Sequence, residues 1–168
     1  GKLASMPDFI IATNGTILDD RIIEYSIRYN WRVGLSFDGP EDVHDIVRTF
    51  RNGKSTVSVI KDNIAKWKAA TGGRCPSSVN ACYSGMHQKN HVTVTDSVKY
   101  LKDELGIEKV NIVPVDASKD SSFGLIDNDC FVDSIKEILD TTSPDYRKYM
   151  FTKLKKLEKV LKAHYCMS

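Results

Sequence analysis

The sequence predicts an α/β fold with about four parallel strands and flanking helices. Short β-prone runs alternate with segments whose apolar residues recur at helical spacing. The separating helices have ten or more residues, which suits the right-handed crossovers that join parallel strands. The 168 residues, 41% hydrophobic and 27% charged, are enough for one ordinary globular domain.

The first half of the chain supplies two strand and helix pairs. The first strand, "DFIIA" at 8–12, stops at the turn Thr13–Asn14–Gly15, and a helix opened by Asp19 and Asp20 begins near Leu18. The second strand, "WRVGLSF", ends at Asp38–Gly39–Pro40 and is followed by a polar loop. Ser55 or Thr56 then caps a helix that Gly72–Gly73 terminates.

The second half continues the alternation and then changes character. The strands "SVNACYS" and "KVNIVPV" enclose a helix over Thr95–Leu105 that Gly106 ends. A polar stretch beginning "DASKDSSFG" follows, and two helices are predicted near Asp129–Leu139 and Asp145–His164. These observations predict a main unit over residues 1–116 and a helical extension over 117–168.

Composition excludes several classes of function. A net charge of +2 gives no argument for nucleic acid or an anionic membrane as partner, and the lysines of "KLKKLEK" are interpreted as a solvated helix face. No apolar run approaches the roughly 20 residues that cross a bilayer, and the N-terminus lacks a long apolar signal region. We therefore expect a cytoplasmic protein whose scattered cysteines, Cys75, Cys82, Cys130 and Cys166, are reduced.

Small polar residues follow all four predicted strands. They occur in the segments 13–15, 36–39, 83–85 and 114–116. Because the carboxyl ends of parallel strands face the ligand in α/β sheets and barrels, this repetition favours a binding face at one rim. Glycine-rich phosphate loops of the G-x-G-x-x-G or G-x-x-x-x-G-K type are absent, which disfavours a nucleotide held in that way.

The histidines have weaker interpretations. His44 and Asp45 could form an acid–base pair, but neighbours in sequence rarely face one another on a helix. His87 and His91 could ligate a metal, although surface histidines flanking a loop-like "QKN" are the favoured interpretation. A classical hydrolase is not indicated, because no nucleophile elbow is present.

Three motifs carry a family resemblance. "IATNGTILDD", "VGLSFDGPEDVHDIVRTFRNGKST" and "LGIEKVNIVPV" resemble the radical S-adenosylmethionine enzymes, in particular the SPASM branch that matures sulfatases and peptides. The resemblance implies that residues 1–116 form the C-terminal half of a partial (βα)6 barrel. It also implies a [4Fe–4S] cluster and S-adenosylmethionine as cofactors. Their reductive chemistry yields a 5′-deoxyadenosyl radical that removes a hydrogen atom from a peptide or protein substrate.

The resemblance also implies site residues. Thr13 or Asn14, and Ser36, would lie beside the ribose or methionyl group of the cofactor. Asn80 and the backbone at Val113 would flank the sugar and adenine.

The motif's charged residues are open to two interpretations. Asp38 would be one of the cofactor-binding residues, and Arg48 or Arg51 would pair with the cofactor carboxylate. Alternatively, Arg48 forms a salt bridge to Asp38 or Asp45 that shapes the loop, and Asp38 only caps the turn.

The departures from the family pattern restrict what this chain does alone. The C-x-x-x-C-x-x-C loop and the glycine-rich motif of the family do not occur in these 168 residues. We therefore expect a piece covering barrel strands three to six, inactive by itself because the main cluster lacks its thiolates. Cys166 stands where the first ligand of an auxiliary cluster would begin, or is an ordinary terminal cysteine.

Two further expectations concern the chain as a whole. A half barrel leaves strand edges uncovered, which favours self-association. The alternative to an enzyme is a self-contained α/β binding or scaffold module without redox chemistry.

Overall fold

The computed structural model describes residues 9–115, 117 and 121–141. The chain forms two compact units, Gly1–Asp127 and Asn128–Ser168. The first unit contains the sheet and five helices of the described residues, and the second contains one described helix.

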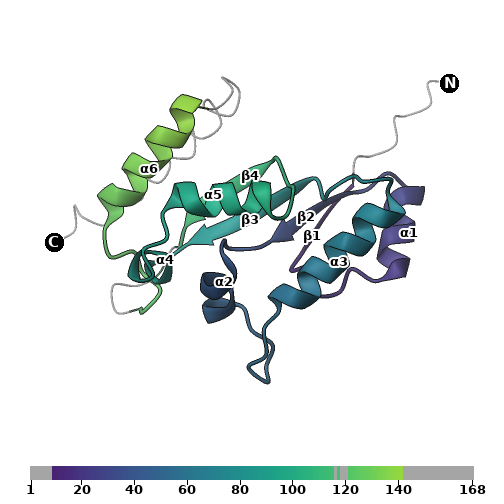
Figure 1. Cartoon of the computed structure of the whole chain (residues 1–168), viewed down its shortest axis with the longest axis horizontal. Helices are drawn as coiled ribbons and strands as arrows, with labels where there is room; N and C mark the ends of the chain where they lie inside the picture. Colours follow the sequence, from purple (N-terminus) through teal and green to yellow (C-terminus); the bar gives the residue numbers. More distant parts are fainter. Residues whose placement is uncertain (1–8, 116, 118–120, 142–168) are drawn as a thin grey trace. The chain divides into compact units, whose positions relative to one another are not determined.

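The sheet has the predicted parallel topology. Its four strands lie side by side in chain order (Figure 1): β1 Ile10–Thr13, β2 Arg32–Ser36, β3 Ser78–Tyr83 and β4 Val110–Pro114. The helices are α1 Asp20–Arg28, α2 Glu41–Val47, α3 Val57–Ala70, α4 Gly85–Lys89, α5 Val94–Asp103 and α6 Asn128–Thr141. The predicted fold class, a partial α/β barrel with four parallel strands, is therefore confirmed.

The two faces of the sheet differ sharply in burial. Side chains alternate between faces along a strand, and residues paired across parallel strands point the same way. One face carries a buried apolar set, Val33, Leu35, Val79, Ala81, Val110 and Ile112. Helices α1, α3 and α5 complete this core with residues such as Ile23, Ile60 and Leu101. The other face remains open.

Local hydrogen bonds explain where the helices begin. Asp19 Oδ1 accepts the Ile22 N–H at 3.0 Å and caps α1, as predicted. Thr93 and Asp96 form a reciprocal capping box at the start of α5. Helix α3 begins directly after Thr56, but the Thr56 hydroxyl does not cap it and instead donates to the carbonyl of Arg48 at 2.6 Å.

Two short helices, α2 and α4, were not predicted from the sequence. Helix α2 follows Pro40 without a capping side chain, and α4 has only five residues, so neither gives a clear periodic signal. Helix α4 nevertheless fixes the segment 121–127. The side chain of Gln88 accepts the Ile126 N–H at 2.7 Å and donates to the Asp127 carbonyl at 2.6 Å. Residues 121–127 therefore belong with the sheet unit, beyond the boundary predicted at 116.

The C-terminal helices are only partly described. Helix α6 matches the helix predicted near 129–139. The helix predicted at 145–164 lies outside the described residues, as does Cys166. In the described ranges, no helix combines the length and the apolar character that crossing a membrane requires.

Candidate functional site

A tight turn places Asp38 at the carboxyl end of β2. The next residue, Gly39, has φ +137°, and a Cβ there would lie 3.0 Å from the hydroxyl of Ser97. A side chain would therefore be strained by both conformation and space. Glycine permits the chain to reverse immediately after Asp38, so that α2 folds back beside the strand.

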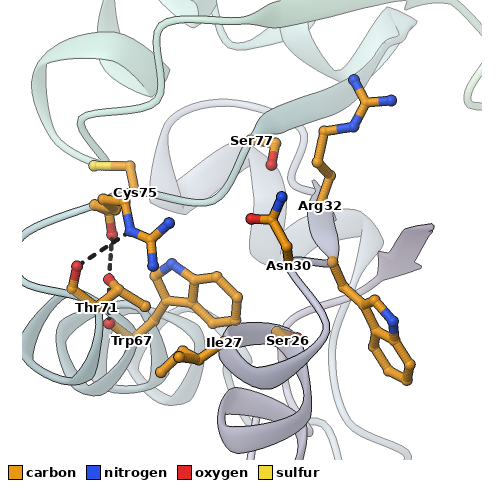
Figure 2. A pocket seen from close by; sticks show the side chains of 10 residues that line it. Ser26, Ile27, Asn30, Arg32, Trp67, Thr71, Cys75 and Ser77 are labelled. Atoms are coloured by element: carbon orange, nitrogen blue, oxygen red, sulfur yellow. Dashed lines mark hydrogen bonds between the residues drawn. The ribbon is translucent and has the colours of Figure 1, made fainter. Parts of the chain in front are cut away.

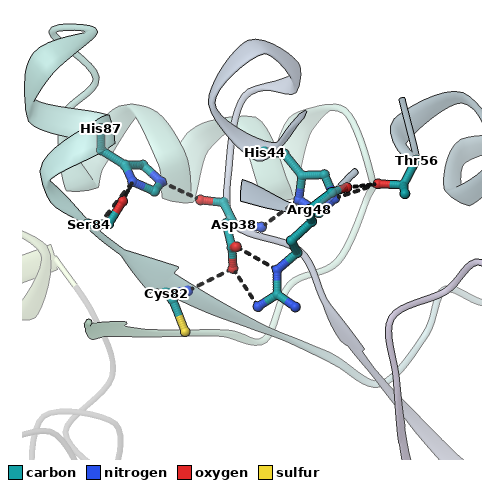
Figure 3. A network of polar contacts seen from close by, with 7 residues as sticks. All are labelled: Asp38, His44, Arg48, Thr56, Cys82, Ser84 and His87. Carbon is teal, nitrogen blue, oxygen red and sulfur yellow. Dashed lines mark hydrogen bonds and ion pairs between the residues drawn. The ribbon is translucent and has the colours of Figure 1, made fainter. Parts of the chain in front are cut away.

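The carboxylate of Asp38 is almost completely enclosed by donors (Figure 3). Arg48 donates from Nε to Oδ2 at 2.6 Å and from Nη2 to Oδ1 at 3.1 Å, and the backbone N–H of Cys82 donates to Oδ1 at 3.0 Å. Asp38 is 1% exposed, whereas Arg48 is 33% exposed. The predicted alternative of a salt bridge between these two side chains is therefore observed, and the bond to Asp38 raises the pKa of Arg48.

Two buried histidines hold the main chain of the same residue. The Asp38 N–H donates to His44 Nδ1 at 3.1 Å, so His44 carries its proton on Nε2 and donates to Thr56 Oγ1 at 3.2 Å. On the other side, the Ser84 N–H donates to His87 Nδ1 at 3.1 Å, and His87 Nε2 donates to the Asp38 carbonyl at 2.7 Å. Each imidazole therefore uses both nitrogens in fixed roles.

Both histidines are neutral because of their surroundings. Burial lowers the pKa of His44 to about 4, and burial also lowers the pKa of His87. The suggested acid–base pairing of His44 with Asp45 is not formed, since Asp45 accepts the Thr56 N–H at 3.1 Å. The interpretation of His87 as a surface histidine is wrong, because it is fully buried; His91 is exposed as expected.

The open face of the sheet carries a polar row. Ser36, Asn80 and Asn111 are consecutive register partners on β2, β3 and β4, and Asn111 Nδ2 donates to Asn80 Oδ1 at 3.0 Å. Two residues closer to the carboxyl ends, and on the same face, Cys82 pairs with Val113. Burial and the nearby Asp38 carboxylate raise the pKa of the Cys82 thiol, against the opposing effect of Arg48. Towards the carboxyl ends this face therefore presents uncharged hydroxyl, amide and thiol groups, and Arg32 lies on the same face at the amino end of β2.

Not all of the predicted site residues come together. Ser36, Asn80 and Val113 share the open face, and Asp38 and Arg48 adjoin its carboxyl edge. Thr13, Asn14 and Arg51 lie elsewhere. The assignment of all of these residues to cofactor binding stays a prediction.

The remaining predicted residues are less well placed. Thr13 pairs with Leu35 and therefore lies on the helix-covered side, where its hydroxyl accepts the Gly15 N–H at 3.1 Å. Asn14 is exposed and accepts from the N–H and hydroxyl of Thr16 at 3.1 and 2.9 Å. Arg51 is exposed in the turn that follows α2.

Sequence reasoning missed Asn111, Cys82 and the structural histidines. Asn111 and Cys82 could have been predicted from the sequence. Each lies two residues from a predicted site residue on the same strand and therefore shares its face. His44 and His87 gave no comparable signal, because each also bonds to a residue more distant in the chain, His44 to Thr56 and His87 to Asp38.

The residues fit the two implied cofactors unequally. Hydroxyl and amide groups on an open face suit the polar ribose and methionyl groups of S-adenosylmethionine. Across the described residues, no three His, Cys, Asp or Glu side chains gather so that they could hold a metal ion. These residues do not fit an iron–sulfur cluster, which requires convergent thiolates.

Comparison with known proteins supports the predicted resemblance. No family model matches the chain. The serine-type anaerobic sulfatase-maturating enzyme of Bacteroides thetaiotaomicron is 36% identical over 69 residues, covering 37% of this chain and 17% of that protein. The solved structure of native anSMEcpe with bound AdoMet has a TM-score of 0.62 at 18% identity. The same protein with AdoMet and the Cp18Cys peptide has a TM-score of 0.65 at 19% identity.

The extent of these matches is partial. Each of the two solved structures matches 83% of this chain, which corresponds to 37% and 38% of the solved chains. The chain thus spans less than two fifths of the length of the proteins whose fold it shares. The predicted resemblance in sequence and in fold is confirmed over these stretches.

Proposed function

We propose that this chain, which resembles anaerobic sulfatase-maturating enzymes in sequence and fold, is part of a radical S-adenosylmethionine enzyme acting on a peptide or protein. Bound with a reduced cluster, the cofactor supplies the means to remove a hydrogen atom from the substrate. The peptide class of substrate is supported by the two solved neighbours that hold AdoMet together with a peptide.

The observation that carries this proposal is the open polar row beside the Asp38–Arg48 pair. Four parallel strands end at one edge, where ligands bind in α/β folds, and the row of Ser36, Asn80 and Asn111 faces away from the helices. A nucleoside lying on this face would meet hydrogen-bonding groups without a competing negative charge. The negative charge of Asp38 is paired with the guanidinium of Arg48.

Arg48 performs two roles under this proposal. Two of the five guanidinium N–H donors are engaged with Asp38, and the side chain is one third exposed. The remaining donors can pair with the carboxylate of the methionyl group. The salt bridge then orients the guanidinium for its ligand, so the two sequence-based alternatives for Arg48 operate together.

The cluster must be held by residues other than the described ones. We propose that a C-x-x-x-C-x-x-C loop precedes this chain in the complete protein and that the chain alone is inactive. The coding sequence upstream of Gly1 tests this directly. A triple-cysteine loop within about a hundred codons supports the enzyme, whereas a start codon at this position supports a self-contained binding module.

A matched pair of serine variants tests the binding face. In the protein that includes the triple-cysteine loop, Ser36→Ala removes a hydroxyl from the carboxyl end of the open face. Ser78→Ala removes one from its amino end, since Ser78 pairs with Gly34. One hydrogen bond is worth about 1 kcal/mol, so Ser36→Ala should raise the KM for S-adenosylmethionine about fivefold, measured by release of 5′-deoxyadenosine.

The control separates binding from folding. Ser78→Ala should leave this KM unchanged, and both variants should unfold at wild-type urea concentrations. Equal effects of the two substitutions would contradict a cofactor at the carboxyl end of the strands.

A further inference from the structure

A pocket lies at the amino ends of the strands, away from the Asp38 network (Figure 2). It is a pocket of about 160 Å³ between the end of α1, the start of β2, the end of α3 and the segment that leads into β3. The Asp38 network belongs to the carboxyl ends of the strands, whereas this pocket belongs to their amino ends. Nothing in the proposed function uses it.

The lining of the pocket favours negative charge. The lining residues include Arg32, Arg74 and Asn30 with several hydroxyl-bearing residues, and none of them is acidic. Figure 2 shows the guanidinium of Arg32 directed away from Trp67, so Arg32 contributes charge at the rim of the pocket. Lys68 adds a third cation close to the lining residue Cys75. Its Nζ and the Cys75 Sγ would both lie 3.2 Å from a Cβ placed on Gly106.

The pocket also contains unused hydrogen-bonding atoms. Among the described residues, two buried side-chain polar atoms lack a partner, Trp67 Nε1 and Ser26 Oγ, and both belong to residues that line this pocket. Trp67 is 6% exposed and Ser26 is 3% exposed. The indole N–H can only donate, so it requires an acceptor. Buried polar groups normally have a partner, and an exception of this kind calls for a physical explanation.

We propose that this pocket binds a small anionic ligand, a carboxylate or a phosphate, one of whose oxygens accepts the Trp67 indole N–H. The surrounding guanidinium groups balance the charge of the ligand. Because solvent does not reach Trp67 Nε1, the ligand must displace a side chain as it enters. Arg74 is suited to this movement, since it is exposed and donates from Nε to the Thr71 carbonyl at a long 3.2 Å.

The two tryptophans of the sequence make the test direct. Trp31 and Trp67 both line the pocket, so both tryptophans of the sequence are placed to report on this site by intrinsic fluorescence. The purified chain is titrated in separate arms with inorganic phosphate and with malonate, against sodium chloride at matched ionic strength. We expect a saturable emission change with at least one of the two anions and none with chloride. The arm that saturates identifies the phosphate or carboxylate class.

Three variants assign the change to the pocket. Trp67→Phe keeps an aromatic ring but removes the N–H, and should weaken binding at least tenfold, with Trp31 as the remaining reporter. Arg74→Gln removes an exposed charge from the lining and should weaken binding to a similar extent. Lys89→Gln removes an exposed charge from the end of α4, outside the pocket lining, and should leave the dissociation constant unchanged.

The overturning results are equally specific. Absence of a saturable change with both anions refutes the site. Undiminished binding by both Trp67→Phe and Arg74→Gln shows that the anion binds elsewhere. Because no step of this inference uses S-adenosylmethionine, its failure would leave the proposed function unaffected, and the reverse also holds.

Discussion

Removing the guanidinium from the Asp38–Arg48 pair should cost far more stability than removing the carboxylate charge. Arg48→Ala leaves the carboxylate of Asp38, which is 1% exposed, with the backbone N–H of Cys82 as its remaining donor among the described residues, at 3.0 Å. Breaking a buried ion pair costs about 3–5 kcal/mol when one charge stays buried. Since Arg48 is 33% exposed, water can enter its place, and we expect about 2–3 kcal/mol.

The opposite substitution is milder for a geometric reason. Asp38→Asn keeps an oxygen that accepts the Cys82 N–H and leaves the positive charge on Arg48, which reaches solvent. We expect a cost of about 1 kcal/mol, comparable to one neutral hydrogen bond. Lys61→Ala serves as control because its partner Glu41 is exposed, and surface pairs contribute less than about 1 kcal/mol.

Urea unfolding at pH 7 measures these differences. With an m-value of about 1.5 kcal/mol per molar urea, Arg48→Ala should lower the midpoint by about 1.3–2 M, and Asp38→Asn by about 0.7 M. The reasoning is refuted if Asp38→Asn is as destabilising as Arg48→Ala, or if Arg48→Ala behaves like Lys61→Ala. Either result would mean that the carboxylate is not dependent on this guanidinium.

Three other predictions concern pH, backbone approach and association. The folded pKa of His44, about 4, is below its ordinary value of 6.5, so the unfolded chain binds more protons and stability should fall as pH drops from 6.5 towards 4. The loss should reach about 3 kcal/mol, and the fall of the urea midpoint between pH 7.5 and 5 should be smaller in His44→Asn, which keeps the contribution of His87. Gly85→Ala would place a Cβ 2.1 Å from the Gly124 carbonyl oxygen, and should release the 121–127 segment, visible as faster amide exchange there. Ile10 is 64% exposed on the edge strand β1, so the chain should self-associate in sedimentation experiments and Ile10→Lys should reduce it; a wild-type monomer at high concentration would contradict this.

The sheet was predictable because local patterns determine it. Each strand combines a short apolar run with a turn signal, and the structure places all four within two residues of the predicted ends. The face of the sheet on which each side chain lies was harder to predict from the sequence. Thr13 and Ser36 both end a predicted strand, so the sequence suggests the same role for both. The pairing of Thr13 with Leu35 nevertheless puts Thr13 on the helix-covered face. Register between strands is a property of the packed sheet, and a slip of one residue reverses the face.

The histidines show a different limit of sequence reasoning. His87 lies in a polar segment and its pattern resembles a surface loop, but its Nε2 bonds to the carbonyl of Asp38, 49 residues earlier in the chain. A buried histidine differs from an exposed one through such partners, and the local sequence does not contain them. Short helices have the same difficulty, because α4 offers too few residues for a periodic pattern.

The residues of the string "SFDGPEDVHDIVR" have two different roles in the structure. Some stabilise the turn at the end of β2, and others face the proposed binding surface. Phe37 is buried in the core, Gly39 permits the turn, and His44 fixes the main chain of Asp38. These residues shape the rim without reaching the open face, whereas Ser36 reaches it directly.

This division makes the two tasks experimentally separable. Substituting His44 should alter stability and its pH dependence, because both ring nitrogens are committed to protein partners. Substituting Ser36 should alter cofactor affinity with little effect on unfolding, because the hydroxyl lies outside the Asp38 network. A motif match alone cannot distinguish these contributions, since folding and binding both depend on the same thirteen letters. The proposed cofactor role therefore depends on Ser36 and on the outer donors of Arg48, and the rest of the string acts by holding them in place.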